Sequence, residues 1–520
     1  MQGILTRCTR HLAMLSTALL LGACSTLGPD YREPEVEWLA QWQPDLYGQA
    51  GAPDQAFERQ LQFWWQLLDD PVLNDLIAKV QSANPTLRIA GLRVLESRAT
   101  LGIAGATQYP QLQQLSGSAA YVDSRQHGGA QDVDNSFTSY ETGFSLGWEL
   151  DFWGRFRRGI ESADAAFFAS ISNRQDAQLL LNAQLVELYF VYKTTLGRIE
   201  IARNNSDIQK RSYEITERIF QSGQDSELDL QQAKTQYLST LSTIPSLEAG
   251  LIKVRNAIAV LLGRPPGVLP ELAEVDAALP DVSSVTVSAV PSRLMMRRPD
   301  IRAAAWQVAA QSAQIGIAEA DYYPSISLFG SFGWSGNSID GSPDTSTLAL
   351  GPAFSWNLFD HGLISNNVRV QDARLQQAIE NFQNTALLAA REIDDAAIDV
   401  VKTAERQSVL HDSVVAAERS LEIANTLYQE GYAGFQRVLD AQRALFAQEE
   451  RELINQSDHI ISVVTLYRAL GGGWQPAIID DLVPTQTRET MEKRTDWGDL
   501  LQAPLPQQTD SRMSETSDER

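Results

Sequence analysis

The clearest pattern in the sequence is an alternation of apolar with small or acidic side chains from Ser139 to Leu150. One face carries Tyr140, Thr142, Phe144, Leu146, Trp148 and Leu150, and the other carries Glu141, Gly143, Ser145, Gly147 and Glu149. A period of two residues predicts a β-strand with one apolar face. Residues 155–222 follow after a four-residue gap and contain no proline. A continuous helix of that length would span roughly 100 Å, which exceeds any globular core and suggests a tube.

The same strand-to-helix unit occurs twice. Residues 363–430 follow the aromatic segment Ala353–Gly362 and contain neither proline nor glycine. Corresponding residues lie 208 positions apart in the strand and long helix and 214 apart upstream: Trp148 and Trp356, Gly154 and Gly362, Gly223 and Gly431, then Pro85 and Pro299, Pro110 and Pro324. This regularity indicates a tandem duplication. It divides the chain into repeat 1 (84–263), an equatorial connector (264–297) and repeat 2 (298–471).

Each repeat is expected to hold a first helix, two strands, the long helix and a returning second helix. The expected ranges are Asn84–Tyr109, Leu112–Tyr121, Ser139–Leu150, 155–222 and Glu227–Leu262, and then Arg298–Tyr323, Ile326–Trp334, Leu348–Phe359, 363–430 and Phe435–Leu470. Loops rich in Gly, Asp, Asn and Ser, Ser124–Asn135 and Ser335–Ser346, join the strands. Because a long helix needs a long neighbour, we expect the helices to stack end to end in two pairs. These pairs are Glu227–Leu262 with Arg298–Tyr323, and Phe435–Leu470 with Asn84–Tyr109.

Four amphipathic strands cannot close a membrane barrel, because the smallest barrels have about eight strands and open edges do not survive in lipid. Two or three chains could close one. The alternative is a soluble β-hairpin on a helical protein, but strands of about ten residues with Phe and Trp on one face favour a membrane barrel. The predicted fold class is therefore mixed α+β, with four strands per chain in a transmembrane β-barrel continued by a long α-helical tunnel.

The two ends of the chain lie outside the repeats. Residues 1–23 carry Arg7 and Arg10 before a short apolar run and predict a secretory leader. The leader ends in Leu-Gly-Ala before Cys24, which resembles the bacterial lipoprotein cleavage box and nominates Cys24 for lipidation; an ordinary signal peptide with a chance cysteine is the alternative. Residues 24–83 are expected to form an N-terminal arm and a short helix, Val72–Ser82. Residues 472–520 are expected to form a C-terminal equatorial segment and a tail that is disordered from Pro484.

Composition narrows the function. The formal net charge of −23 argues against nucleic acid as a partner, because phosphate binding requires a basic face. Of the two cysteines, Cys8 lies in the leader, so the mature chain has no internal disulfide to stabilise it. The five histidines are scattered without metal-binding spacing, and no nucleophile or phosphate-loop motif is present. We therefore predict no enzyme activity and no cofactor.

The order of short motifs resembles the outer membrane factor family, the TolC-like proteins, and in particular its efflux lipoproteins of the NodT type. The motifs run from Cys24 to Trp474: Leu21–Cys24, Gly28–Tyr31, Phe63–Trp65, Asp70–Pro71, Asn84–Pro85, Glu149–Arg155, Arg297–Ile301, Tyr323–Pro324, Leu439–Gln442 and Leu470–Trp474. Each motif alone is weak. Their order together with the duplication makes the resemblance specific.

This resemblance implies a homotrimer with a 12-stranded barrel in the outer membrane and a helical tunnel in the periplasm. It also implies a periplasmic adaptor and an inner-membrane transporter of the RND type as partners, and the function of an efflux exit duct. The duct of a type I protein secretion system and a non-conducting structural lipoprotein are the alternatives. In relatives, rings of acidic and aromatic side chains close the periplasmic tip, and the matching gate residues are Asp440 and Tyr428. Asp440 could instead be an ordinary carboxylate of the first helical turn or the helix face, and Tyr428 could simply pack the turn.

Overall fold

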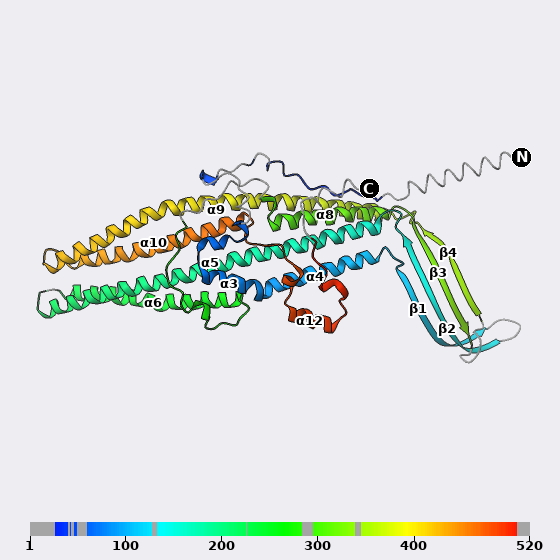
Figure 1. The fold of residues 1–520 in the computed structure, drawn as a ribbon, viewed down its shortest axis with the longest axis horizontal. Coiled ribbons are helices and arrows are strands. Elements are labelled where there is room, and N and C mark those ends of the chain that lie inside the picture. Colours follow the sequence, from blue (N-terminus) through cyan, green and yellow to red (C-terminus); the bar gives the residue numbers. More distant parts are fainter. Residues whose placement is uncertain are drawn as a thin grey trace.

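The structure is a computed structural model that describes residues 26–39, 42, 46–48, 60–126, 133–224, 226–282, 295–337 and 345–506. It is elongated, with helical hairpins at one end and a four-stranded sheet at the other (Figure 1). The principal elements are α3 (Pro71–Ala83), α4 (Pro85–Ala106), β1 (Leu112–Gln126), β2 (Val133–Leu150), α5 (Arg155–Gln221), α6 (Glu227–Leu261), α8 (Pro299–Ala320), β3 (Ser325–Gly336), β4 (Thr345–Ser355), α9 (Leu363–Gln429) and α10 (Gln436–Ala469). Shorter elements are the 3₁₀ turns η1 (Leu46–Gly48), η2 (Trp64–Leu68), η3 (Pro270–Leu272) and η4 (Gly498–Leu501), with α11 (Ile479–Leu482) and α12 (Thr485–Arg494). Among the described residues, no helix is sufficiently long and apolar to cross a membrane.

The strands form an antiparallel meander in the order β1-β2-β3-β4. The two repeats join where β2 pairs with β3, with Phe144 opposite Phe332. The first hairpin is longer than predicted, since pairing continues through Ser124 opposite Asn135 to Gln126 opposite Val133. Both ends of the expected loop Ser124–Asn135 are therefore strand, and residues 127–132 lie outside the described part of the chain. The ladder extends there because backbone hydrogen bonds need no apolar side chain. β4 ends earlier than predicted, at Ser355, because its partner β3 begins at Ser325.

Both long helices begin at a glycine that an aspartate precedes by two or three residues. Gly154 and Gly362 have left-handed backbones, with φ of 74° and 87°. The carboxylate of Asp151 accepts hydrogen bonds from the N–H groups of Phe156 and Arg157, and that of Asp360 accepts one from Ile364. These bonds satisfy backbone donors that a helix leaves free at its start. An aspartate shortly before a left-handed glycine therefore marks the start of the long helix in both repeats.

The predicted stacking of the shorter helices is wrong. Each repeat stacks its own pair end to end, α6 with α4 and α10 with α8, as Figure 1 shows. The Asn84 side chain donates to the carbonyl of Leu261 over 2.9 Å, and Arg298 donates to that of Ala469 over 2.8 Å. Asn84 thus precedes α4 and binds the end of α6, and Arg298 precedes α8 and binds the end of α10. Helix ends leave carbonyls without partners, which explains why a polar side chain at the junction selects this arrangement.

The C-terminal segment is folded through Pro506, which corrects the expectation of disorder from Pro484. Leu482, Val483, Met491 and Leu501 are buried against Val94 of α4 and against Phe167 and Phe168 of α5. Arg98 of α4 also donates to the carbonyl of Ala503 over 2.6 Å. A few widely spaced apolar side chains stabilise this segment. Because the segment is mostly polar, its composition alone wrongly predicted disorder. Residues 507–520 lie outside the described part of the chain.

Candidate functional site at the tip of the helical hairpins

The hairpins α5/α6 and α9/α10 end in matching turns. Gly223 and Gly431 adopt φ of 77° and 78°. In the first turn, the N–H of Gln224 bonds the carbonyl of Ile219, and that of Gly223 bonds Phe220. The second turn repeats the pattern, from Tyr432 to Leu427 and from Gly431 to Tyr428. Such paired bonds close a helix where glycine takes a left-handed conformation, so both turns are fixed by their backbones.

A small apolar core stabilises the second hairpin near this tip. Phe435, Val438 and Leu439 at the start of α10 are buried against Leu421 and other residues of α9. The core also includes Ala233 of α6. The two hairpins therefore contact one another close to their free ends.

Closest to the tip, three polar contacts connect the first hairpin to the second. The hydroxyl oxygens of Thr216 and Tyr428 lie 3.3 Å apart. The buried Gln442 donates from Nε2 to Ser212 Oγ over 2.7 Å. Arg443 donates from Nε to Gln236 Oε1 over 2.7 Å. We call these three contacts the tip links. The sequence prediction found only Tyr428 among their six residues.

The two predicted gate residues occupy different environments. The Tyr428 ring lies 5.2 Å from the ring of Phe435, so this side chain packs the turn as well as binding Thr216. Asp440 lies in the second turn of α10, and its side chain is 63% exposed. Its carboxylate accepts from Gln436 over 3.0 Å and lies 3.8 Å from Arg443. Asp440 therefore lies beyond the first turn, on an exposed face of α10, and Arg443 connects it to the tip links.

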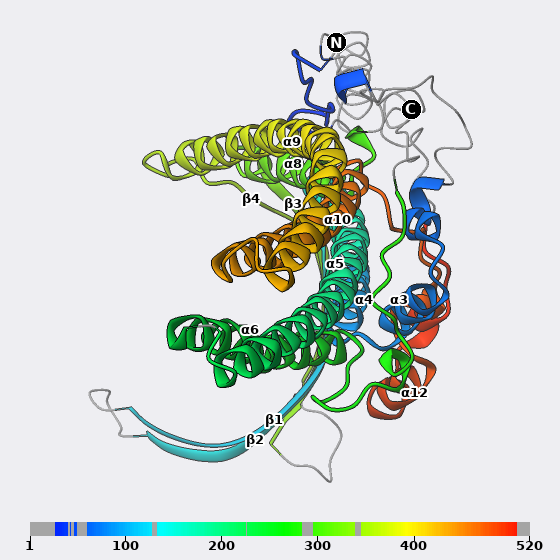
Figure 2. The same ribbon diagram turned by 90° about the vertical axis from the view of Figure 1, so that its left-hand side faces the viewer.

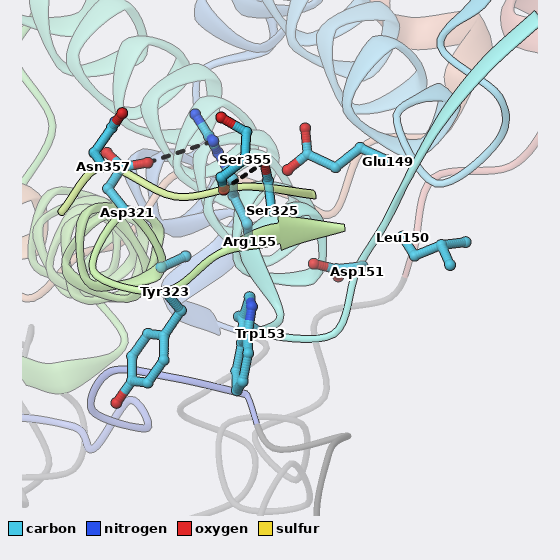
Figure 3. A pocket seen from close by; sticks show the side chains of 11 residues that line it. Glu149, Leu150, Asp151, Trp153, Arg155, Asp321, Tyr323, Ser325, Ser355 and Asn357 are labelled. Carbon is cyan, nitrogen blue, oxygen red and sulfur yellow. Dashed lines mark hydrogen bonds and ion pairs between the residues drawn. The ribbon is translucent and has the colours of Figure 1, made fainter. Parts of the chain in front are cut away.

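The opposite end of the helices meets the sheet at a small polar cavity of about 100 Å³ (Figure 3). Arg155 and Asp321 form an ion pair of 3.4 Å across it. On the other side of this cluster in Figure 3, the ring of Trp153 stacks on Tyr323 with centroids 4.6 Å apart. Trp153 also donates to the carbonyl of Pro324 over 2.8 Å. These contacts join α5, α8 and the start of β3, and fix the sheet on the helices.

Cys24, the predicted lipidation site, lies outside the described residues. The arm that follows it is held firmly, because the buried Arg158 donates to the carbonyl of Leu27 and forms a 2.8 Å ion pair with Asp30. Gly28 lies against Gly316 of α8 so closely that a Cβ atom would clash with that backbone. In the described part of the chain, no group of three or more His, Cys, Asp or Glu residues is placed to hold a metal ion.

In the described part of the chain the sheet is open at β1 and at β4, and it lies at one end of long helical hairpins. This arrangement defines a subunit of a membrane channel that neighbouring copies must complete. The model of the family "Outer membrane efflux protein" matches residues 76–264 and 290–472, so the chain belongs to this family.

Similarity to individual proteins supports this family assignment. The chain is 31% identical to the cation efflux system protein CusC of Escherichia coli O6:H1, over 88% of this chain and 97% of CusC. It is 29% identical to the toluene efflux pump outer membrane protein TtgI of Pseudomonas putida, over 88% and 97% of the two chains. Among solved structures, the outer-membrane channel OprN matches with a TM-score of 0.77 and 32% identity, over 87% of this chain and 100% of that one.

The comparisons confirm the predicted fold class, a chain that supplies four strands to a trimeric 12-stranded barrel continued by a helical tunnel. They also confirm the outer membrane location and the function of an efflux channel. The alternative of a non-conducting structural lipoprotein is thereby excluded. The family consists of efflux channels rather than enzymes. The gate residues and the lipidation of Cys24 stay predictions.

Proposed function

We propose that the homotrimer is the exit channel of a tripartite efflux pump and that its resting state is closed at the helical tip. An RND-type transporter in the inner membrane supplies the energy, and a periplasmic adaptor docks on the tip. The observation that carries this proposal is the set of tip links, which hold the second hairpin against the first where the channel ends. The relatives are named for cargoes as unlike as cations and toluene, so the proposed role is conduction rather than recognition of one substrate.

Single-channel recording tests the closed resting state. The purified trimer in a planar bilayer is expected to show a small conductance that rises when the tip links are removed. A channel that is fully conducting without adaptor and transporter would contradict the proposal. Co-purification with an adaptor should depend on the residues of the two turns and not on the sheet.

Asp440 is proposed to contribute one carboxylate from each subunit to a ring at the tip. We expect Asp440→Asn to raise the resting conductance and to weaken block by divalent cations added from the tip side, because a ring of like charges attracts cations. Asp229→Asn is the matched control. Asp229 lies near the turn of the first hairpin, where it accepts from Ser226 over 2.8 Å. Equal effects of the two substitutions, or none, would place the constriction elsewhere.

Cys24 is proposed to carry the lipid. Cys24→Ser should abolish acylation of the mature N-terminus, as seen by mass spectrometry of the intact protein. The trimer should survive in detergent, because strand pairing in the shared barrel, and not the lipid, joins the three chains. Arg158 also holds the arm independently of the lipid. A mature N-terminus at another residue would refute this prediction.

A further inference from the structure

A cavity of about 420 Å³ lies outside the tip and the sheet junction, between α3, α4, α5 and the C-terminal segment. Its lining includes Arg88, Arg174, Gln178, Asp480 and Asp481. Figure 2 shows α3 and α12 on the convex side of the curved layer of long helices. The cavity is therefore on the side that faces away from the channel axis, and its volume is in the range of small-ligand sites.

The unusual residue in this cavity is Arg174. Its side chain is only 4% exposed, yet it makes no ion pair within the described part of the chain. The guanidinium donates to the carbonyl of Asp481 over 2.8 Å, while its Nε has no hydrogen-bond partner there. Burial lowers the pKa of Arg174, and the charge of Asp481 opposes this effect only in part. A buried cation that lacks a paired anion is costly, so the cavity favours a negatively charged group beside Arg174.

A second buried group restricts the kind of anion. Gln178 lies one helical turn beyond Arg174, is 7% exposed, and has an Oε1 without a hydrogen-bond donor among the described residues. A ligand that satisfies both groups needs an acceptor for Arg174 and an N–H for Gln178. Asp480 and Asp481 at the rim disfavour a doubly charged phosphate, although Arg488 pairs with Asp480 over 2.6 Å. A monoanionic carboxylate next to an amide N–H satisfies all these conditions, and a guanidinium matches a carboxylate through two parallel hydrogen bonds.

We propose that this cavity binds the C-terminal carboxylate of a peptide on the outer surface of the tunnel. Arg174 binds the carboxylate, and Gln178 accepts from the adjacent amide N–H. The half-buried Arg88, which also lines the cavity, adds positive charge. The site is independent of conduction, since none of these residues takes part in the tip links.

Calorimetric titration of the purified full-length trimer with N-acetyl-alanyl-alanine tests the proposal. The free acid is expected to bind, and its C-terminal amide should bind at least about tenfold more weakly, because it lacks the charge that Arg174 requires. Arg174→Lys should lower the affinity for the free acid by a similar factor, since lysine keeps the charge but loses the planar pair of donors. Arg203→Lys on the same helix is the matched control, because Arg203 is exposed and pairs with Glu248.

Gln178→Met separates binding from folding, since it removes the acceptor while keeping the size of the side chain. This substitution should lower the affinity for the free acid several-fold and leave the melting temperature of the trimer unchanged or higher. The proposal is overturned if acid and amide bind equally, if neither binds at about 10 mM, or if both Arg174→Lys and Gln178→Met leave the affinity unchanged. Tighter binding of inorganic phosphate than of the acid would also overturn it.

Discussion

Replacing Arg298 with methionine is expected to destabilise the protein by about 2–3 kcal/mol. This is less than the roughly 3–5 kcal/mol of a fully buried ion pair, because Asp300 and Glu392 are partly exposed. The Arg298 side chain is 10% exposed and pairs over 2.8 Å with both Asp300 and Glu392. It also bonds the last carbonyl of α10, at Ala469. Its loss would leave these carboxylates without their counter-charge and break the junction between α10 and α8. A lower midpoint of thermal unfolding of the detergent-solubilised trimer measures the effect.

The loss should depend on pH. Burial first, and then the negative charge of Asp300, raises the pKa of Asp176 to about 6, while Arg298 lowers it. A carboxyl whose pKa is raised in the folded state destabilises that state increasingly as pH rises from its ordinary range through the folded pKa. Without Arg298 the pKa of Asp176 rises further, so the variant should lose more stability at about pH 7.5 than at about pH 5.

Arg391→Met is the control for this prediction. Arg391 is 66% exposed and its ion pair with Asp395 measures 3.8 Å, so its loss should cost less than about 1 kcal/mol at either pH. If Arg298→Met and Arg391→Met unfold at the same temperature, Arg298 does not stabilise the junction of α10 and α8.

Most of the fold could be predicted from the duplication in the sequence. Matched positions such as Gly223 and Gly431 predicted the ends of the long helices to within one residue, because hydrophobic periodicity and turn residues are local features of the sequence. The partners of the shorter helices could not be predicted in the same way. Helix lengths were compatible with either pairing, and the choice depends on Asn84 and Arg298 binding carbonyls far away in the sequence. Long-range polar contacts of this kind produce no periodic pattern in the sequence.

The candidate site was predicted less completely than the fold. Tyr428 and Asp440 came from a family resemblance, and the structure adds the partners that give Tyr428 a role. Thr216 and Gln442 have Ala424 and Lys234 at the equivalent places of the other repeat. These two positions have therefore diverged between the copies, whereas Ser212, the partner of Gln442, has Ser420 at its equivalent place. The sequence alone did not reveal which residues face each other.

Removing all three tip links should open the channel. The proposed variant combines Tyr428→Phe, Gln442→Leu and Arg443→Ala, which delete the polar groups while the ring of residue 428 still packs on Phe435. A net hydrogen bond contributes about 1 kcal/mol, so three together shift the ratio of closed to open states by about a hundredfold. A channel that is open about 1% of the time would then be open about half of the time. Single-channel recording in planar bilayers measures this open fraction directly.

The matched control makes the same three changes at exposed positions beside the same turn, Tyr432→Phe, Gln429→Leu and Arg437→Ala. None of these residues contacts the first hairpin through a hydrogen bond in the described part of the chain, so the control should keep the resting conductance of the unmodified protein. Tyr428→Phe alone should change the open fraction about fivefold at most, because the bond of 3.3 Å to Thr216 is long. If the triple variant conducts no more than its control, the tip links do not hold the channel closed. The hairpins would then be kept together by contacts that the variant leaves intact. These are the apolar core around Phe435 and Ala233 and, farther from the tip, the bonds of Asn205 to Glu449 and of Arg198 to Glu450.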